Sequence, residues 1–577
     1  MNGQPKGPFY VVLFLVIAGL VGFALYRADI FAPKAQRPGG VIDPGQLGQN
    51  AESADDAAPI TTVKEYAFRP AERLPEIKET SAYKPLTDGT LRFALNVWAG
   101  WAPIVLANDG FKAEKEWTAP TGKKFKVELV LIDDPAAMLA AYQAGEVHIG
   151  WGTLDMVPLF VDTMVDRQGR PKDPRVMPRI FQQIDWSNGG DGIVVRESIR
   201  TVSDLRGKKL VLAQNSPSQY FALNMLVAGG VQPAEVDMIY TNTAFEAAAA
   251  FNADKSLTGA VSWAPDIYNL AKVKGNRMLV TTQTANKLIA DVWFARADFA
   301  QDHPDICEAL VRGIFDAMEE LKKPDRKERA AQLLAAGYNI PADEATAMFG
   351  DMHNTNWAEN YQFFLNQNNP TNFERIWRQS YYLYRQIGTI QNAPVSFDKV
   401  MDFSLIQKLG KEEKYASQRD EYQVTLAPKT VGEIRAESPE ILTNTVVIHF
   451  YPNDWDVYKK VVREIDGKKV EVPYDPNAKS VLQGVAELVG KFGAARVIIE
   501  GHTDASMRGQ VPEALVTELS LNRAQAVREA LVREYKLEPS RLMVDGMGWD
   551  RPADPKNPFN HAKNRRVEVK VYPAEVE

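Results

Sequence analysis

A chain of 577 residues, with 67 Lys and Arg against 74 Asp and Glu, is too long for one compact domain and carries a mildly acidic net charge of −7. The sequence contains no block of Lys or Arg typical of a nucleic-acid surface, so that class of partner is excluded. Cys307 is the only cysteine, which excludes intrachain disulfides, thiolate zinc clusters, iron–sulfur sites and a lipoprotein anchor.

The clearest targeting signal is an uncharged apolar run at residues 9–26, which follows a short segment at residues 1–8. At about 1.5 Å per residue, such a helix spans roughly 27 Å, just enough for the core of a bilayer. We predict an uncleaved transmembrane helix with residues 1–8 on the cytoplasmic side; a cleaved signal peptide is the alternative. Because Arg27 and Lys34 follow the run, the flanking charges favour the opposite orientation.

Residues 27–88 begin with a stretch rich in Pro, Gly, Ala, Asp and Gln, which is the composition of a flexible linker. Beyond it, short β-rich runs such as residues 126–132 alternate with helices such as residues 134–144. The cycle restarts after Asp185. This alternation predicts two α/β lobes with parallel sheets and a cleft between them, within a domain at residues 89–424.

A second interruption by proline and charge, at residues 425–442, predicts another linker. The final domain, residues 443–577, combines an amphipathic helix at residues 477–492 with apolar strands at residues 446–450 and 496–500. The order of its elements predicts a compact α+β unit of the βαβαββ type.

Three separated motifs fall within the final domain. They are Gly501-His502-Thr503-Asp504, Leu519-Ser520-Leu521-Asn522-Arg523-Ala524 and Asn564-Arg565-Arg566-Val567-Glu568-Val569. Asp504 ends a predicted strand and Arg523 begins a predicted helix, so both can face one crevice. An acid and a base held apart can receive a zwitterion, because carboxylate pairs with guanidinium and ammonium with carboxylate. In this order and spacing, the motifs resemble the OmpA-family peptidoglycan-binding domain.

The resemblance implies that the zwitterion is the diaminopimelate side chain of a peptidoglycan stem, with Asp504 taking its ammonium and Arg523 its carboxylate. A structural ion pair between these two residues is the alternative. His502 is interpreted as a packed neighbour. The period of two in the last strand predicts that Arg565 supports the site from within and that Arg566 is solvated. The predicted peptidoglycan-binding residues are Thr503, Asp504, Leu519, Ser520, Arg523, Asn564 and Arg565.

The central domain carries four further motifs. They are Gly100-Trp101-Ala102-Pro103, Ala144-Gly145-Glu146-Val147-His148-Ile149-Gly150, Asp204-Leu205-Arg206-Gly207-Lys208-Lys209 and Trp263-Ala264-Pro265-Asp266. Their order resembles type II periplasmic solute-binding proteins, especially the nitrate, sulfonate and thiamine-precursor branch. Ligands of such α/β lobes bind at the carboxyl ends of strands, where loops face the cleft.

Polar and aromatic residues in the loops after predicted strands are therefore the candidate solute-binding residues. As a group, the tryptophans favour an organic ligand with apolar or cationic character, and the aspartates can supply a partner for a cation. The alternative is that the tryptophans pack the lobes and that the aspartates are caps or turn residues. The candidates are Trp98, Trp101, Thr153, Asp185, Ser187, Asp191, Asn215, Ser216, Ser218, Trp263, Asp266 and Asp291.

Enzymatic chemistry is not expected. The six histidines show no HExxH-like spacing, and the sequence has no nucleophile elbow or phosphate-cradling glycine loop. The cysteine-rich motif of the thiamine-precursor synthases that share this fold is also missing. We therefore predict no catalytic residues, no metal and no cofactor.

The combined prediction is a single-pass protein of the bacterial inner membrane, with the bulk of the chain in the periplasm. It binds peptidoglycan non-covalently and a small organic solute, and so tethers a transport function, as in an ABC importer, or a sensing function to the cell wall. The alternative is a stator-like or structural envelope subunit whose solute-binding domain is a protein-interaction module; the predicted span has no ionisable group for direct ion conduction. A polytopic membrane-protein partner and a homodimer are left open.

Overall fold

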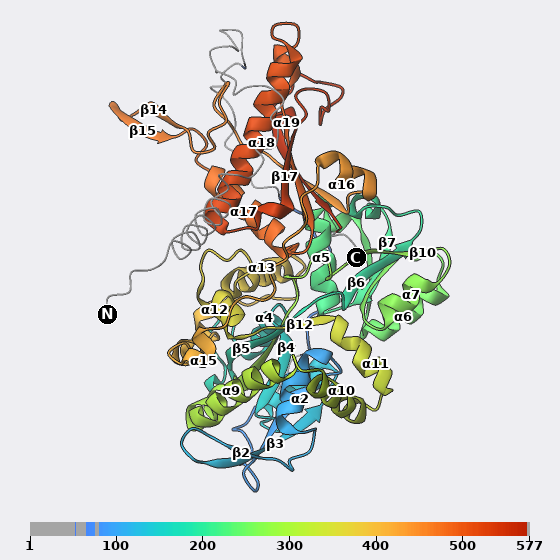
Figure 1. Ribbon diagram of the computed structural model, residues 1–577, viewed down its shortest axis with the longest axis vertical. Helices are drawn as coiled ribbons and strands as arrows, with labels where there is room; N and C mark the ends of the chain where they lie inside the picture. Colours follow the sequence, from blue (N-terminus) through green and yellow to red (C-terminus); the bar gives the residue numbers. More distant parts are fainter. Residues whose placement is uncertain (1–51, 53–64, 76–79, 574–577) are drawn as a thin grey trace, which may run out of the picture.

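The computed structural model describes residue 52, residues 65–75 and residues 80–573. The predicted membrane helix at residues 9–26 lies outside the described residues. Within the described part of the chain, no helix combines the length and the apolar composition needed to cross a membrane. These residues form two α/β lobes with an α+β domain at one end (Figure 1).

The first lobe is built on a seven-stranded sheet with the order β12-β5-β11-β4-β1-β3-β2. Helix α3 begins where the Asp134 carboxylate accepts the Ala137 N–H at 2.8 Å, and Gly145 follows its end at φ +73°, so the helix predicted there is confirmed. The elements of this lobe are β1 (Thr90–Leu95), α2 (Ala102–Asn108), β2 (Glu116–Thr118), β3 (Lys124–Leu131), α3 (Pro135–Gln143), β4 (Ile149–Thr153), α4 (Val157–Met164), β5 (Pro178–Ser187), β11 (Ala290–Arg296) and β12 (Met352–Asn354).

The second lobe is built on a five-stranded sheet with the order β10-β6-β9-β7-β8. Its central strand β7 pairs in parallel with both neighbours, β8 and β9, whereas β6 pairs antiparallel with β9 and β10. The chain crosses between the lobes twice, from β5 into β6 and from β10 into β11, which confirms the predicted two-lobed architecture. The elements are β6 (Asp191–Arg196), β7 (Lys209–Ala213), α5 (Pro217–Ala228), β8 (Asp237–Thr241), α6 (Ala244–Ala253), β9 (Gly259–Trp263), α7 (Asp266–Lys272) and β10 (Asn276–Thr281).

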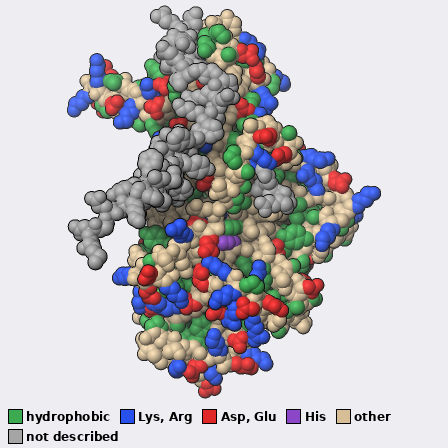
Figure 2. All heavy atoms as spheres, viewed as in Figure 1, with side chains coloured by type: hydrophobic (Ala, Val, Ile, Leu, Met, Phe, Trp, Pro, Cys, Tyr) green, Lys and Arg blue, Asp and Glu red, His purple; other side chains and the backbone are tan. Residues whose placement is uncertain are grey.

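A run of helices follows β11 and packs mainly on the first lobe; α9, for example, lies against α2. On the face of the central domain seen in Figure 2, acidic and basic side chains are interspersed rather than gathered into a field of one sign. The helices are α8 (Ala297–Asp302), α9 (Pro304–Glu320), α10 (Pro324–Tyr338), α11 (Ala342–Ala347), α12 (Trp357–Leu365), α13 (Phe373–Gln386), α14 (Ser404–Leu409) and α15 (Glu413–Ala416).

The C-terminal domain has a four-stranded sheet with the order β13-β18-β16-β17, against which α17 and α18 pack. A hairpin of β14 and β15, which the sequence patterns did not predict, projects from the domain (Figure 1). The elements are α16 (Val431–Glu437), β13 (Leu442–Val446), β14 (Lys460–Ile465), β15 (Lys468–Pro473), α17 (Ala478–Lys491), β16 (Arg496–His502), α18 (Glu513–Tyr535), β17 (Leu542–Gly546), α19 (His561–Asn564) and β18 (Arg566–Tyr572).

The segment expected to be a linker at residues 425–442 is packed onto the C-terminal sheet. Its helix α16 buries Ile434, and Arg435 forms an ion pair with Glu500 on β16. The C-terminal domain also contacts the central domain directly, through an ion pair of 2.6 Å between Arg375 and Glu487. The two domains therefore share an interface.

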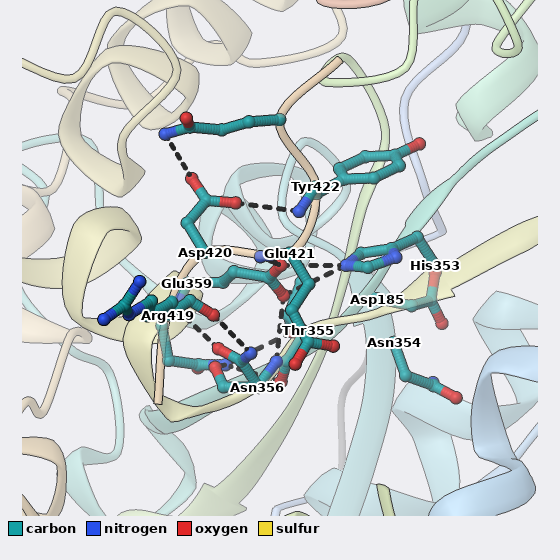
Figure 3. A network of polar contacts seen from close by, with 12 residues as sticks. Asp185, His353, Asn354, Thr355, Asn356, Glu359, Arg419, Asp420, Glu421 and Tyr422 are labelled. Carbon is teal, nitrogen blue, oxygen red and sulfur yellow. Dashed lines mark hydrogen bonds and ion pairs between the residues drawn. The ribbon is translucent and has the colours of Figure 1, made fainter. Parts of the chain in front are cut away.

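The end of the central domain is fixed close to one of the crossovers. His353 Nε2 lies 3.0 Å from Glu359 Oε1, and its ring stacks on Tyr422 at 4.0 Å between ring centres (Figure 3). The Tyr422 hydroxyl donates to Asn188 Oδ1 at 2.9 Å, and Asn188 lies between β5 and β6. Residues leading to the C-terminal domain therefore contact the segment that joins the lobes.

Candidate functional site

The site in the C-terminal domain is built where strand β16 ends. Asp504 follows this strand and caps a short 3-10 turn, with its carboxylate accepting the Ser506 N–H at 2.7 Å. The Asp504 side chain is buried, and Arg565, directly before β18, donates its Nε–H to it. The acid predicted to take an ammonium is thus paired with an arginine of the third motif.

Arg523 projects from α18 and is 3% exposed. Its Nε–H donates to the Asp454 carbonyl at 3.1 Å, and its guanidinium carbon lies 5.1 Å from the centre of the Phe450 ring. Both of its Nη atoms donate to the carboxylate of Glu52, one of them at 2.7 Å. Arg523 therefore grips a carboxylate in a bidentate manner, and neither it nor Asp504 pairs with the other.

The other predicted residues of this site shape its walls. The Thr503 N–H donates to the Gly548 carbonyl at 2.8 Å, and the Ser520 hydroxyl accepts the Gly548 N–H at 2.9 Å. Leu519 is fully buried in the core, and the Asn564 side chain hydrogen-bonds the backbone of the loop before it. These contacts fix the loops around Asp504; the roles of these residues toward peptidoglycan stay predictions.

The prediction that Arg566 is solvated is wrong. Arg566 is 5% exposed, donates to the Arg551 carbonyl at 2.9 Å and pairs with Glu568 at 2.7 Å. The alternating pattern of a strand separates its two faces, but it does not show that the chain at Arg551 covers this end of β18.

Sequence reasoning missed the part of the site between β13 and β14, which contains Phe450, Asn453 and Asp454, and it missed Glu52. None of these residues lies in a motif, so no local signal marked them. The pocket at this site is lined by Ile448, His449, Phe450, Tyr474, His502, Arg523, His561, Ala562, Arg565 and Arg566.

Behind the site, Glu500, His502 and Glu568 bring three potential metal-ligand atoms within 4.8 Å of one another. Lys570 Nζ already lies 3.2 Å from Glu500 and 3.6 Å from Glu568, and Arg435 pairs with Glu500 as well. Burial alone would raise the pKa of Glu500, but His502, Lys570 and Arg435 together hold it at about 2. These acids are neutralised by the protein's own cations, which fits His502 as a packed neighbour.

The central candidate site lies where the chain crosses between the lobes. The Ser187 hydroxyl donates to Asp191 Oδ2 at 2.7 Å, and it lies 2.8 Å from the Thr282 hydroxyl on the return crossover. Thr282 Oγ1 also accepts the N–H groups of Gly189 at 2.9 Å and Asp191 at 3.1 Å. One threonine therefore ties the two crossovers together.

Four buried carboxylates, those of Asp155, Asp185, Asp191 and Asp291, form what we call the acidic group. On the first-lobe sheet, Asp291 stands opposite Thr153 on β4 and opposite Asp185 on β5. Burial raises the pKa of Asp155 and Asp185 to about 7 and that of Asp191 to about 6. The pKa of Asp291 is also raised, by burial and by the charges of its acidic neighbours.

The acidic group has no compensating cation among the residues that the structure describes. Its hydrogen-bond partners are neutral: Trp98 Nε1 donates to Asp185 at 3.1 Å, and the Tyr384 hydroxyl donates to Asp155 at 3.2 Å. Among the described residues, no lysine or arginine forms an ion pair with any of the four carboxylates. Since buried carboxylates are normally paired, the group is missing a positive charge.

Some of the candidate tryptophans lie at the acidic group, where they can contribute to a solute site, whereas others pack the lobes. Trp98 contacts Asp185, and Trp263 at the end of β9 stands opposite Asp191 at the start of β6. Trp101 is fully buried and donates to Asn96 Oδ1 at 2.7 Å, which is the packing role considered as the alternative.

The remaining candidates lie in the second lobe. The Asn215 side chain donates to the Glu72 carbonyl at 3.0 Å, and the Ser216 hydroxyl donates to the Ala213 carbonyl at 2.8 Å. Ser218 is fully buried in the first turn of α5, and Asp266 begins α7. Burial raises the pKa of Asp266. The roles of these residues toward a solute stay predictions.

Asp155 is the member of the acidic group that the sequence analysis missed. It follows Thr153 by two residues at the end of β4, and this spacing after a strand was the signal available. Its partner Tyr384 comes from α13, far along the chain, and only the folded structure brings the two together.

This arrangement defines the class of protein: a two-lobed fold of the periplasmic-binding-protein type joined to a C-terminal domain that is similar to the OmpA family. Residues 469–566 match the OmpA family, and residues 188–327 match the family described as NMT1/THI5 like. Both predicted resemblances are thereby confirmed.

The curated relatives each match one part of the chain. The taurine-binding periplasmic protein of Escherichia coli K12 is 26% identical over 212 residues, which are 35% of this chain and 62% of the relative. Outer membrane protein Omp38 of Acinetobacter baumannii is 36% identical over 115 residues, which are 20% of this chain and 30% of the relative. The chain thus spans less than two thirds of the length of either relative.

Among solved structures, the periplasmic aliphatic sulphonate binding protein SsuA of Escherichia coli is 18% identical, with 53% of this chain and 96% of that chain covered and a TM-score of 0.40. The periplasmic nitrate-binding protein NrtA of Synechocystis PCC 6803 is 15% identical, with 56% and 88% covered and a TM-score of 0.40.

Proposed function

We propose that this protein binds peptidoglycan non-covalently through its C-terminal site and a small organic solute in its central cleft. The observation that carries the first half is the bidentate grip of Arg523 on a carboxylate beside the Asp504–Arg565 pair. A carboxylate receptor next to an acid suits the zwitterionic end of a diaminopimelate stem. Each charge-assisted bond contributes on the order of 1.5–3 kcal/mol, and repeated stems on the polymer add avidity.

Sedimentation of the full-length chain with diaminopimelate-type sacculi tests this site. Wild-type protein is expected in the pellet, whereas Arg523→Ala and Asp504→Ala are expected to stay in the supernatant. Arg463→Ala, exposed on the β14 hairpin, removes the same charge as Arg523→Ala without touching the site and is the matched control. Equal sedimentation of all four proteins contradicts the assignment.

For the central cleft, the chemistry of the acidic group supports a solute that carries a positive charge. Its carboxylates have no cationic partner in the described part of the chain, and Trp98 beside Asp185 offers an aromatic ring of the kind that attracts cations. A single metal ion is less suited to the cleft, because in the described chain no three of these carboxylates bring ligand atoms within 4.8 Å of one another. An organic ammonium is a bulkier cation than a metal ion and can contact carboxylates that are spread apart.

Titration calorimetry with choline and putrescine, with ethanesulfonate as the anionic comparison, tests the charge of the solute. The cations are expected to bind the wild-type chain and to lose affinity in Asp185→Asn/Asp291→Asn. Asp254→Asn, outside the acidic group on the second lobe, is the control and keeps wild-type affinity. Binding of ethanesulfonate alone contradicts a cationic solute.

The finer proposal is that residues 9–26 anchor the protein in the inner membrane, so that the central domain stays in the periplasm while the C-terminal domain binds the wall. The uncharged apolar run supports it. Membrane fractions extracted with alkaline carbonate are expected to retain the full-length chain and to release a chain that lacks residues 9–26. Release of both chains contradicts the anchor.

A further inference from the structure

The C-terminal site already holds a carboxylate of its own chain. Glu52 precedes Arg523 by 471 residues, is 3% exposed, and accepts hydrogen bonds from both Nη atoms of Arg523. Its Oε2 also accepts the Asn453 N–H at 3.4 Å, and its Oε1 lies 3.7 Å from Arg565 Nε. Glu52 thus makes the contacts expected of the carboxylate of a bound ligand.

Charge pairing explains why a carboxylate is held there. Arg565 is engaged by Asp504, so Arg523 without Glu52 is a buried cation whose remaining polar partner among the described residues is the neutral Asp454 carbonyl. Burial alone would raise the pKa of Glu52, but the charge and hydrogen bonds of Arg523 outweigh burial and lower it. Glu52 is therefore ionised at neutral pH and balances Arg523.

We propose that Glu52 is an intramolecular ligand that occupies the carboxylate position of the peptidoglycan site, so that a stem peptide binds by displacing it. The inference rests on the proposed function of this site. Because Arg565 holds Asp504 in the same way, the groups expected to take the carboxylate and the ammonium are both occupied by the chain itself. A wall that presents many stems competes with this contact better than a free stem does.

Displacement of Glu52 by a stem peptide affects the N-terminal side of the chain and the apparent affinity for peptidoglycan. Glu52 lies between residues 9–26, the predicted anchor, and the central domain. Binding to the wall releases Glu52 from the C-terminal domain. The apparent Kd equals the intrinsic Kd divided by the fraction of molecules that are open, so a contact formed in about nine of ten molecules weakens binding about ten-fold.

Calorimetric titration of the full-length chain with a soluble diaminopimelate-containing muropeptide tests the competition. Glu52→Gln keeps the shape of the side chain and removes its charge, and it is expected to bind about ten-fold more tightly than wild type. Glu65→Gln, exposed in the same N-terminal region, is the matched control and keeps wild-type affinity. Equal affinity of Glu52→Gln and wild type overturns the proposal.

A second measurement needs no peptidoglycan. Thermal unfolding is compared for wild type, Glu52→Gln, Arg523→Gln and the double variant. Paired residues give a double variant whose change in Tm is smaller than the sum of the single changes, whereas the cycle of Glu65→Gln with Arg523→Gln is additive. If the changes in Tm are additive in the Glu52 cycle, the proposal for Glu52 is overturned, but the proposed peptidoglycan binding is not. If Glu52 and Arg523 are coupled but no variant binds the muropeptide, the proposed function is overturned, and with it the proposed competition between Glu52 and the stem peptide.

Discussion

The two candidate sites differ in how their buried charges are balanced. In the C-terminal site, Arg523 and Arg565 are matched by Glu52 and Asp504. In the central site, the four carboxylates of the acidic group have no cationic partner among the described residues. A balanced site is stable when empty and must be opened before a ligand binds, whereas an unbalanced site is destabilised when empty and gains most from a ligand that supplies the missing charge.

The largest expected effect is the loss of one acid from the balanced site. Asp504→Asn removes the carboxylate that accepts the Arg565 Nε–H and leaves Arg565 with the more distant Glu52 at 3.7 Å; breaking a buried ion pair from one side costs about 3 kcal/mol. Chemical denaturation of the full-length chain measures this loss. Asp554→Asn removes an acid that pairs with the exposed Lys563 in the same domain and is expected to cost less than about 1 kcal/mol. A loss no larger than that of the control contradicts the balanced site.

An Asp→Asn substitution in the acidic group is expected to raise the stability of the empty chain rather than lower it. Asp185→Asn keeps an acceptor for Trp98 and removes one of several mutually repelling buried charges. We expect it to stabilise the empty chain by on the order of 1–3 kcal/mol, since one unit of pKa corresponds to about 1.4 kcal/mol. Thermal unfolding without ligand checks this. A lowered Tm shows that the negative charge of Asp185 is compensated after all.

The unbalanced charge of the acidic group also predicts how the stability of the protein depends on pH. The pKa values of Asp155 and Asp185 are raised to about 7 in the folded chain, so between about pH 4 and pH 7 the folded state binds protons that the unfolded state has released. The free energy of unfolding must therefore fall as pH rises through this window. The difference between wild type and Asp185→Asn/Asp291→Asn isolates the effect, because His148 and His303, whose pKa values are lowered by burial, contribute equally in both proteins. A difference that is constant from pH 4 to pH 8 contradicts the prediction.

Local patterns predicted the elements well where the physical cause is local. The cap at Asp134 and the strand–helix alternation of the lobes come from neighbouring residues, and three motifs located Asp504 and Arg523. The pairing of Glu52 with Arg523 joins residues 471 apart, and no periodicity reports a contact of that kind. For the same reason the burial of Arg566 under the chain at Arg551 was missed.

The smallest expected effect concerns the crossover between the lobes. Ser187→Ala removes the hydroxyl that donates to Asp191 at 2.7 Å, and losing a hydrogen bond to a charged group costs about 1.5 kcal/mol. Because that bond lowers the pKa of Asp191 from the value that burial alone would give, its loss raises this pKa further and moves the pH-dependent loss of stability to higher pH. Ser256→Ala removes a comparable bond to Asp254, but in an exposed loop, so it is the control and is expected to change neither quantity. Unfolding curves of both variants across pH 5 to pH 8 check the prediction. If Ser187→Ala behaves like the control, the Ser187 hydroxyl does not stabilise the ionised form of Asp191, and the contacts of Thr282 with the Asp191 backbone hold the crossover without it.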